Sequence, residues 1–301
     1  MRGMTGWLCC ALLLPVLAVA AAPAPMRYIH PPPESLLDNR YDFEWKILET
    51  ALERTRQAWG DYRIEVSDFM TEQRQVHELT QASGRLSMIF RGTTPDMERS
   101  LQPVRIPVDL NLQGYCVLLI RAGEQSRFDA VRTLEDLKSL TVGLGLGWID
   151  VDILRANGLN VVTGSSYEGL FDMLRQRRFD VLLRSSVEVL DEHAQRRGAT
   201  PELAIEQRLL IYYPMPMYFW FRGDDEGRRL AARVETGMRA MLEDGSYQRI
   251  FAEYQDHKIR QLRLAERHII RLRNPLLGSE AFNDSRLWFN PASYQPAAGA
   301  R

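Results

Sequence analysis

The sequence is short of two features that often reveal a function at once: cysteine, and an excess of charge of one sign. Its 301 residues include only 3 cysteines, and 38 Lys and Arg stand against 39 Asp and Glu, for a net charge of −1. A nucleic-acid-binding chain needs a basic stripe, so this balance argues against that class. Cys9 and Cys10 fall in an N-terminal apolar run, which leaves Cys116 without a partner for an internal disulfide. Stability must therefore come from the core.

Motifs for catalysis and metal binding are missing as well. The sequence has no His-Glu-x-x-His and no Gly-x-Ser-x-Gly, and its 5 histidines are scattered. Cys116 stands in the apolar stretch YCVLLI, where we expect a buried and inert thiol. We therefore expect no catalytic residue, no metal ion and no cofactor.

The N-terminus has the pattern of a secretory signal peptide. Arg2 precedes the apolar run of residues 7–22, and Ala-Val-Ala at residues 18–20 provides a small-x-small cleavage signal. The run is short and interrupted by proline, which disfavours a membrane span. We expect residues 1–22 to be removed and the mature protein to reside in the periplasm.

The remaining length exceeds one typical domain, which predicts two lobes. Short apolar runs alternate with segments of helical periodicity, the pattern of sheets covered by helices. The predicted strands are residues 26–30, 62–66, 86–90, 115–121, 140–144, 160–163, 179–183, 209–213 and 218–221. The predicted helices are residues 41–58, 73–81, 134–137, 150–156, 167–176, 187–195, 230–243, 247–254 and 262–272.

Two extended stretches, residues 103–114 and 209–213, separate these α/β units and predict two crossings between the lobes. The expected organisation is a first lobe of residues 23–112 and 214–301, with a C-terminal extension at 258–301, and a second lobe of residues 113–213. We expect the extension to clamp the back of the first lobe. Because open α/β sheets bind ligands at the carboxyl ends of their strands, the expected site is the cleft between the lobes.

Five short motifs follow one another at consistent separations. They are TLEDLK at 133–138 followed by LTVGLGLG at 140–147, YEGLFDML at 167–174, RFDV at 178–181 and LEDGSYQRI at 242–250. Through them, residues 26–257 resemble the bacterial extracellular solute-binding proteins of family 3, the periplasmic receptors of polar amino-acid transporters. The resemblance implies an α/β fold of the type II periplasmic-binding class, with two sheet lobes joined by two crossing strands.

The resemblance also implies a function. We expect a monomer that closes around a small polar solute, anionic or amino-acid-like, and presents it to an ABC permease. A sensory membrane protein could read the same closure. Two alternatives remain open: a dehydratase-like periplasmic enzyme with His30, Glu34 or Asp180 as general acid or base, and an interaction protein that has lost its ligand.

Some candidate ligand-binding residues follow from the resemblance. Thr93 and Arg99 approximate the family's carboxylate-binding Thr-x-x-Arg, at a stretched spacing. The position of the family's ammonium-binding Asp is occupied by Ser185. Tyr28 and His30 flank the end of the first strand, where the family places an aromatic ring over its ligand, although His30 could equally be a fixed loop residue.

Other candidates follow from the residues themselves. Arg91 comes after a predicted strand, Arg184 holds the corresponding position in the second lobe, and both could bind an anion. The alternative is that they pair with acids such as Glu34 or Glu188 and latch the lobes. The turn that contains Gly147 and Trp148 precedes a helix and could receive an anion, with Trp148 as an aromatic wall or a core cap. Ser166 is expected to cap a helix and could also contact the ligand.

Overall fold

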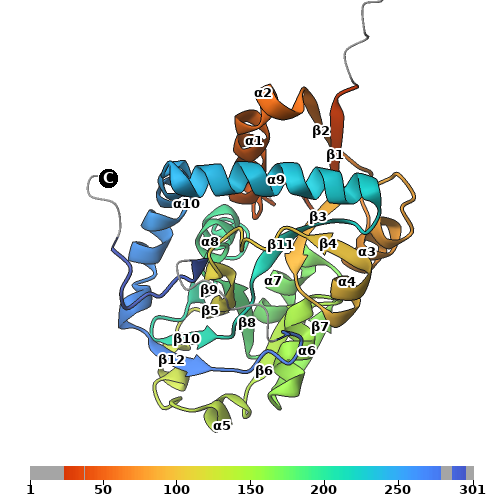
Figure 1. Ribbon diagram of the computed structural model, residues 1–301. Coiled ribbons are helices and arrows are strands. Elements are labelled where there is room, and N and C mark those ends of the chain that lie inside the picture. The colour runs from red at the N-terminus through yellow and green to blue at the C-terminus, as the bar shows by residue number, and fades with distance from the viewer. Residues whose placement is uncertain (1–23, 37, 279–286, 296–301) are drawn as a thin grey trace, which may run out of the picture.

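The computed structural model of the chain describes residues 24–36, 38–278 and 287–295 (Figure 1). The predicted signal peptide lies outside the described residues. The strands are β1 (Met26–His30), β2 (Tyr62–Val66), β3 (Met88–Gly92), β4 (Leu101–Pro103), β5 (Tyr115–Arg121), β6 (Thr141–Gly145), β7 (Asn160–Gly164), β8 (Val181–Ser185), β9 (Leu203–Ile205), β10 (Leu209–Tyr212), β11 (Met217–Arg222) and β12 (His268–Arg271). The helices are α1 (Asp42–Arg54), α2 (Arg56–Trp59), α3 (Glu72–Thr80), α4 (Pro95–Ser100), α5 (Leu134–Leu137), α6 (Ile149–Ala156), α7 (Tyr167–Arg175), α8 (Val189–Arg196), α9 (Asp225–Glu243) and α10 (Ser246–Gln261). No helix among the described residues is long and apolar enough to cross a membrane.

One half of the molecule is built on two small sheets. β1 pairs in parallel with β2, and β11 lies antiparallel between β3 and β4. The aromatic side chains of β11 pack into the core, where Phe219, Trp220 and Phe221 are fully buried. The long helix α9 begins at the cap Asp224, whose side chain accepts the N–H of Gly227. Figure 1 shows α9 lying across this half, and it packs on α1 and β11.

The other half is built on the larger sheet, which the described residues form in the order β12-β10-β5-β8-β6-β7, with β9 beside β5. β6 runs parallel to β7 and β8, whereas β5 is antiparallel to β8, β9 and β10. Every residue of β5 is buried, as expected for a strand covered on both faces. A capping box of Thr133 and Asp136 opens α5.

Two adjacent segments join the halves, residues 104–114 between β4 and β5 and residues 213–216 between β10 and β11. The N–H of Tyr213 donates to the carbonyl of Gly114 at 3.1 Å, and the N–H of Met215 donates to Oδ1 of Asn111 at 2.6 Å. At Gly114 a Cβ atom would lie 2.2 Å from the Tyr213 carbonyl oxygen, so the close approach of the two segments requires glycine. The predicted pair of crossings is present, although most of 209–213 belongs to the sheet as β10.

Asp109 holds the first crossing together and gives it a pH dependence. Its buried carboxylate accepts the N–H groups of Asn111 and Gln113 at 3.1 and 2.5 Å, and burial raises its pKa to about 7. The folded chain therefore binds this proton more tightly than the unfolded chain, for which a pKa of about 4 is ordinary. Stability is lost as the pH rises from about 4 to about 7 and is not regained above that.

We expect the free energy of unfolding to fall between pH 5 and pH 8, with Asp109 contributing about 3 kcal/mol of the decline. Urea denaturation at both pH values, followed by circular dichroism, measures this change. Asp109→Asn cannot ionise, so the variant should show a smaller decline than the wild type. An equal decline in both proteins would contradict the assignment.

The C-terminal extension departs from the prediction. Instead of a helix at 262–272, α10 continues to Gln261, and β12 then pairs in parallel with β10, from Leu209↔His268 to Tyr212↔Arg271. The β-branched pair Ile269 and Ile270 favours a strand. This segment therefore completes the larger sheet. The predicted boundaries had instead placed it on the first lobe.

The last described residues, 287–295, pack where the two halves meet. The N–H of Phe289 donates to the carbonyl of Leu110 at 2.7 Å, and its carbonyl accepts the hydroxyl of Tyr115 at 3.1 Å. The ring of Phe289 lies against Phe251 of α10. The chain end therefore contacts the first crossing, the start of β5 and α10 together.

Candidate functional site

A cavity of about 180 Å³ lies between the two halves. Its wall includes the carboxyl ends of β1 and β3 from one half and of β8 from the other, represented by His30, Gly92 and Ser185. Residues of the crossings and the first turn of α6 complete it. This is where the strand order predicted a ligand site.

The wall of the cavity combines apolar surface with many charged side chains, and it carries more acids than bases. Five rings also reach it, from His30, Tyr41, Trp45, Phe90 and Trp148. Its guanidinium groups belong to Arg40, Arg91 and Arg184. Its carboxylates belong to Glu34, Asp38, Asp42, Glu72, Asp150 and Glu188.

Arg91 connects the two halves across the cavity. Its Nη2 lies 2.7 Å from Oε2 of Glu72 on α3 and donates to the carbonyl of Gly147, in the turn before α6, at 3.0 Å. Its Nη1 is buried and has no hydrogen-bond partner among the described residues. Burial raises the pKa of Glu72, although Arg91 opposes that shift. The predicted structural pairing of Arg91 is therefore present, with Glu72 in place of the expected Glu34.

Arg184 is the centre of a buried ion-pair cluster. Its side chain is 4% exposed, with Nη2 2.7 Å from Glu188 and 2.6 Å from Glu192, while Nε donates to Glu192 at 2.7 Å. Its guanidinium lies 4.6 Å from the centre of the Trp148 ring. Burial raises the pKa of Glu188. For Glu192, the attraction of Arg184 and its hydrogen bonds outweigh burial and hold the pKa below its usual range.

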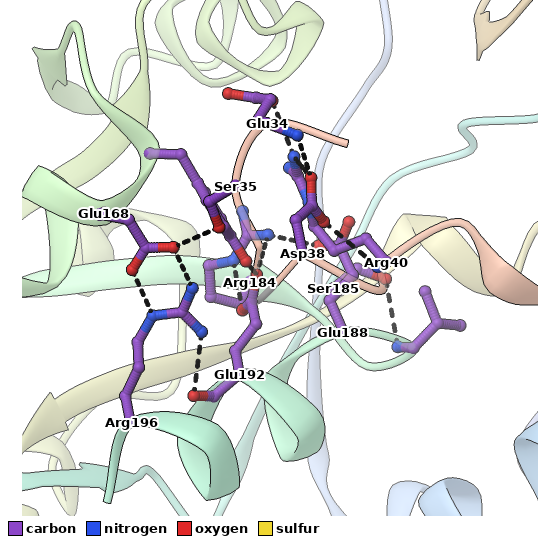
Figure 2. A network of polar contacts seen from close by, with 12 residues as sticks. Glu34, Ser35, Asp38, Arg40, Glu168, Arg184, Ser185, Glu188, Glu192 and Arg196 are labelled. Carbon is purple, nitrogen blue, oxygen red and sulfur yellow. Dashed lines mark hydrogen bonds and ion pairs between the residues drawn. The ribbon is translucent and has the colours of Figure 1, made fainter. Parts of the chain in front are cut away.

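Arg40 was not predicted, yet it is a buried charge that the first half contributes to the cavity. Its side chain is 3% exposed, and it pairs with Asp38 and Glu34 at 2.7 Å each. Figure 2 shows this triad beside the cluster of Arg184. The Arg40 guanidinium lies 4.2 Å from the centre of the ring of Tyr167, on α7 of the other half. The sequence signal was the density of charge that follows the prolines at 31–33.

The same loop makes a second contact with α7. The hydroxyl of Ser35 donates to Glu168 at 2.8 Å, and Arg196 of α8 pairs with Glu168 at 2.6 Å (Figure 2). Residues 31–36 and 38–40 therefore reach from the end of β1 to the second half. We call these residues the bridging loop.

The turn at Gly147 and Trp148 does not present an anion site. Gly147, at a φ of +87°, offers its carbonyl oxygen to Arg91, and carbonyl oxygens attract cations. The positive end of α6 already carries the carboxylate of Asp150 in its first turn, and that carboxylate accepts the hydroxyl of Tyr213. Burial raises the pKa of Asp150. Trp148 lines the cavity as the predicted aromatic wall, with its ring against Gly145.

Comparison with known proteins concerns the fold. No family model matches the chain, and no curated protein matches it. An ancestral arginine-binding protein bound to arginine is similar in structure, with a TM-score of 0.56 and 18% identity over 76% of this chain and 98% of that one. So is a periplasmic His/Glu/Gln/Arg/opine family-binding protein from Silicibacter pomeroyi in complex with lysine, at 0.55 and 13% over 76% and 96%. An ancestral amino-acid-binding protein, a precursor of cyclohexadienyl dehydratase, gives 0.54 and 12% over 76% and 95%.

The chain has the two-lobed periplasmic-binding-protein fold. This confirms the predicted fold class, with two α/β lobes joined by two crossings. At these identities the likeness establishes the fold and leaves the ligand open.

In this periplasmic-binding-protein fold, two predicted ligand contacts lie inside the protein. Tyr28 is fully buried, and its hydroxyl donates to the carbonyl of Leu230 on α9 at 3.3 Å. Thr93 is buried, and its hydroxyl donates to Glu98 at 2.7 Å. Tyr28 shares a face of β1 with His30, but it lies two residues before the carboxyl end of the strand, so it packs beneath α9 and only His30 reaches the cavity.

Three further predicted residues lie away from the cavity. The side chain of Arg99 is 70% exposed and pairs with Asp96 on the surface of α4. Ser166 caps α7 by accepting the N–H of Gly169. Asp180, the proposed acid or base, precedes β8 at the end of that strand remote from the cavity. None of the three belongs to its lining.

His30, Ser185 and Cys116 do line the cavity. The His30 ring stacks on Trp45 at 4.2 Å, and burial lowers its pKa. The hydroxyl of Ser185 accepts the N–H of Val187 at 3.4 Å. Cys116 is buried, as predicted, and burial raises the pKa of its thiol, which makes it a poor nucleophile.

Proposed function

We propose that this chain is a periplasmic solute-binding protein that holds a small, amino-acid-like solute between its lobes and presents it to a membrane transporter. The observation that supports this most directly is the cavity itself. Both halves contribute to its wall, at the strand ends, with aromatic rings and charged groups together. The alternative partner is a sensory membrane protein that recognises the closed, solute-bound conformation.

The charges of the wall favour a solute that carries a protonated amine. Each of the three guanidiniums already pairs with a carboxylate of the protein, and the wall carries twice as many carboxylates as guanidiniums. Glu72 and Asp150 carry raised pKa values caused by burial, and a nearby cation would stabilise their charged forms. An anionic solute, expected from Arg91 and Arg184 alone, is therefore disfavoured.

Thermal-shift measurements at pH 7 test this proposal. We expect cationic and zwitterionic amino acids or diamines to raise the melting temperature, whereas dicarboxylates and phosphate esters leave it unchanged. A ligand at 100 times its Kd stabilises the folded state by about 2.7 kcal/mol. Mass spectrometry of the same mixtures should show no conversion, and conversion would instead favour the dehydratase-like alternative.

We expect Glu72→Gln to weaken the binding of the amine by about tenfold, since one charge-assisted contact of about 1.4 kcal/mol corresponds to that factor. Glu135→Gln, an exposed change on α5, is the matched control and should bind like the wild type. Stabilisation by dicarboxylates alone, lost on replacement of Arg91, would contradict the charge argument.

A further inference from the structure

The strand β2 has one unpaired edge. It pairs with β1 along its whole length, from Met26↔Tyr62 to His30↔Val66. Among the described residues, no other strand pairs with it, and β1 and β2 form a two-stranded sheet. A row of unpaired backbone N–H and C=O groups on an edge is a template for a strand of another chain.

Apolar side chains gather at this edge. Five large apolar side chains are exposed among the described residues, and three of them are Ile64 at 36%, Val66 at 59% and Phe69 at 60%. Two belong to β2, and the third follows it by three residues. Exposed apolar groups that cluster in this way mark interaction surfaces. No proline or lysine, the usual protections of an edge strand, occurs in β2.

The sequence of β2 is complementary to itself in the antiparallel direction. Tyr62-Arg63-Ile64-Glu65-Val66, paired about Ile64 with a second copy, places Arg63 opposite Glu65 of that copy, and Glu65 opposite its Arg63. It also places Ile64 opposite Ile64, and Tyr62 opposite Val66. Directly opposite residues share a face, and opposite charges and apolar pairs there are stabilising.

Both charges are available for such a contact. Arg63 is exposed, and no hydrogen bond or ion pair joins it to a residue that the structure describes. Glu65 accepts Nε and Nη2 of Arg27 at 3.0 and 2.7 Å, but each carboxylate oxygen has a second lone pair. One Glu65 can therefore bind Arg27 of its own chain and Arg63 of another.

We propose that two copies of this chain associate through their β2 edges, antiparallel and related by a two-fold axis. We take the occupant to be a second copy because Arg63 and Glu65 lie opposite each other when two β2 strands run antiparallel. A two-fold axis produces that antiparallel arrangement. One short strand pair is a small interface, so the dimer is weak and concentration-dependent. This differs from the monomer expected from the sequence, and no residue of β2 lines the cavity.

Sedimentation velocity over a micromolar to high-micromolar concentration series tests the proposal on the exported protein. The wild type should show a reversible monomer–dimer equilibrium. Arg63→Glu and Glu65→Arg each place two like-charge pairs across the interface, and each should weaken dimerisation by at least about tenfold. Arg178→Glu, the same charge change at an exposed site between α7 and β8, should dimerise like the wild type.

The decisive measurement mixes the two single variants. A chain with glutamates at 63 and 65 complements a chain with arginines at both positions, so the equimolar mixture should form heterodimers with an affinity near that of the wild type. Melting curves show whether each variant is folded. A monomeric wild type, a dimer insensitive to both variants, or a mixture that does not associate would overturn the proposal.

Discussion

Arg184→Met is expected to lower the free energy of unfolding by about 3–5 kcal/mol, because it leaves two buried carboxylates without their cation. Glu188 and Glu192 are as buried as Arg184 itself, and methionine offers neither carboxylate a hydrogen-bond donor. Methionine keeps most of the side-chain volume, so the fall in the free energy of unfolding reflects the missing charge and not a new cavity. Urea denaturation at pH 7, followed by far-ultraviolet circular dichroism, measures the change.

Two comparisons separate this effect from a general loss of structure. Arg175→Met removes an exposed pair with Asp172 on α7 and should cost less than about 1 kcal/mol. The addition of Glu188→Gln and Glu192→Gln to Arg184→Met should recover part of the loss, since neutral side chains tolerate burial better. Lower pH should also reduce the deficit, because protonation neutralises both acids. If Arg184→Met lowered the free energy of unfolding no more than Arg175→Met does, Arg184 would not be required to compensate the two buried carboxylates.

Arg40→Ala is expected to change both stability and shape. The side chain of Asp38 is 1% exposed. Without its partner Arg40, this buried carboxylate should lower the free energy of unfolding by about 3–5 kcal/mol. The variant also loses the contact between the bridging loop and the ring of Tyr167, which joins the two lobes. We therefore expect the solute-free variant to have a larger radius of gyration than the wild type in small-angle X-ray scattering.

A second substitution separates these two effects. Asp38→Asn added to Arg40→Ala removes the stranded charge, so it should restore stability but leave the lobes apart. Arg239→Ala, which breaks an exposed pair with Glu235 on α9, is the control and should scatter like the wild type. If Arg40→Ala scatters like the wild type as well, the contact between Arg40 and Tyr167 does not hold the lobes together.

Local periodicity was sufficient for most of the elements. The helix predicted at 167–176 is α7 at Tyr167–Arg175, because Ser166 gives it a sharp start and its apolar stripe is regular. The strand predicted at 179–183 is β8 at Val181–Ser185. Phe179 resembled a strand residue, yet its ring packs closely against Gly143 of the neighbouring strand. Shifts of this kind moved Arg184 from the expected turn into the strand.

The partners of the charged residues could not be predicted in the same way. Arg91 and Glu72 meet because β3 and α3 pack together, and Arg91 then donates to the carbonyl of Gly147 on the other side of the cavity. The contact between Arg91 and Gly147 depends on how the lobes face one another, which no local sequence pattern encodes. Arg40 was missed for the same reason, since its role exists only once the bridging loop reaches Tyr167. Tyr28 was misplaced because alternation puts it on the same face of β1 as His30 without saying which of the two reaches the cavity.

The position of β12 has a consequence for biogenesis. The edge of β10 is covered by residues 268–271, which follow all the other strands in the sequence and are therefore synthesised after them. Until that segment has emerged, the larger sheet presents an open edge, and such edges invite aggregation. The lobe that is central in the sequence is thus completed late, and truncations before residue 268 should leave the edge of β10 open to aggregation.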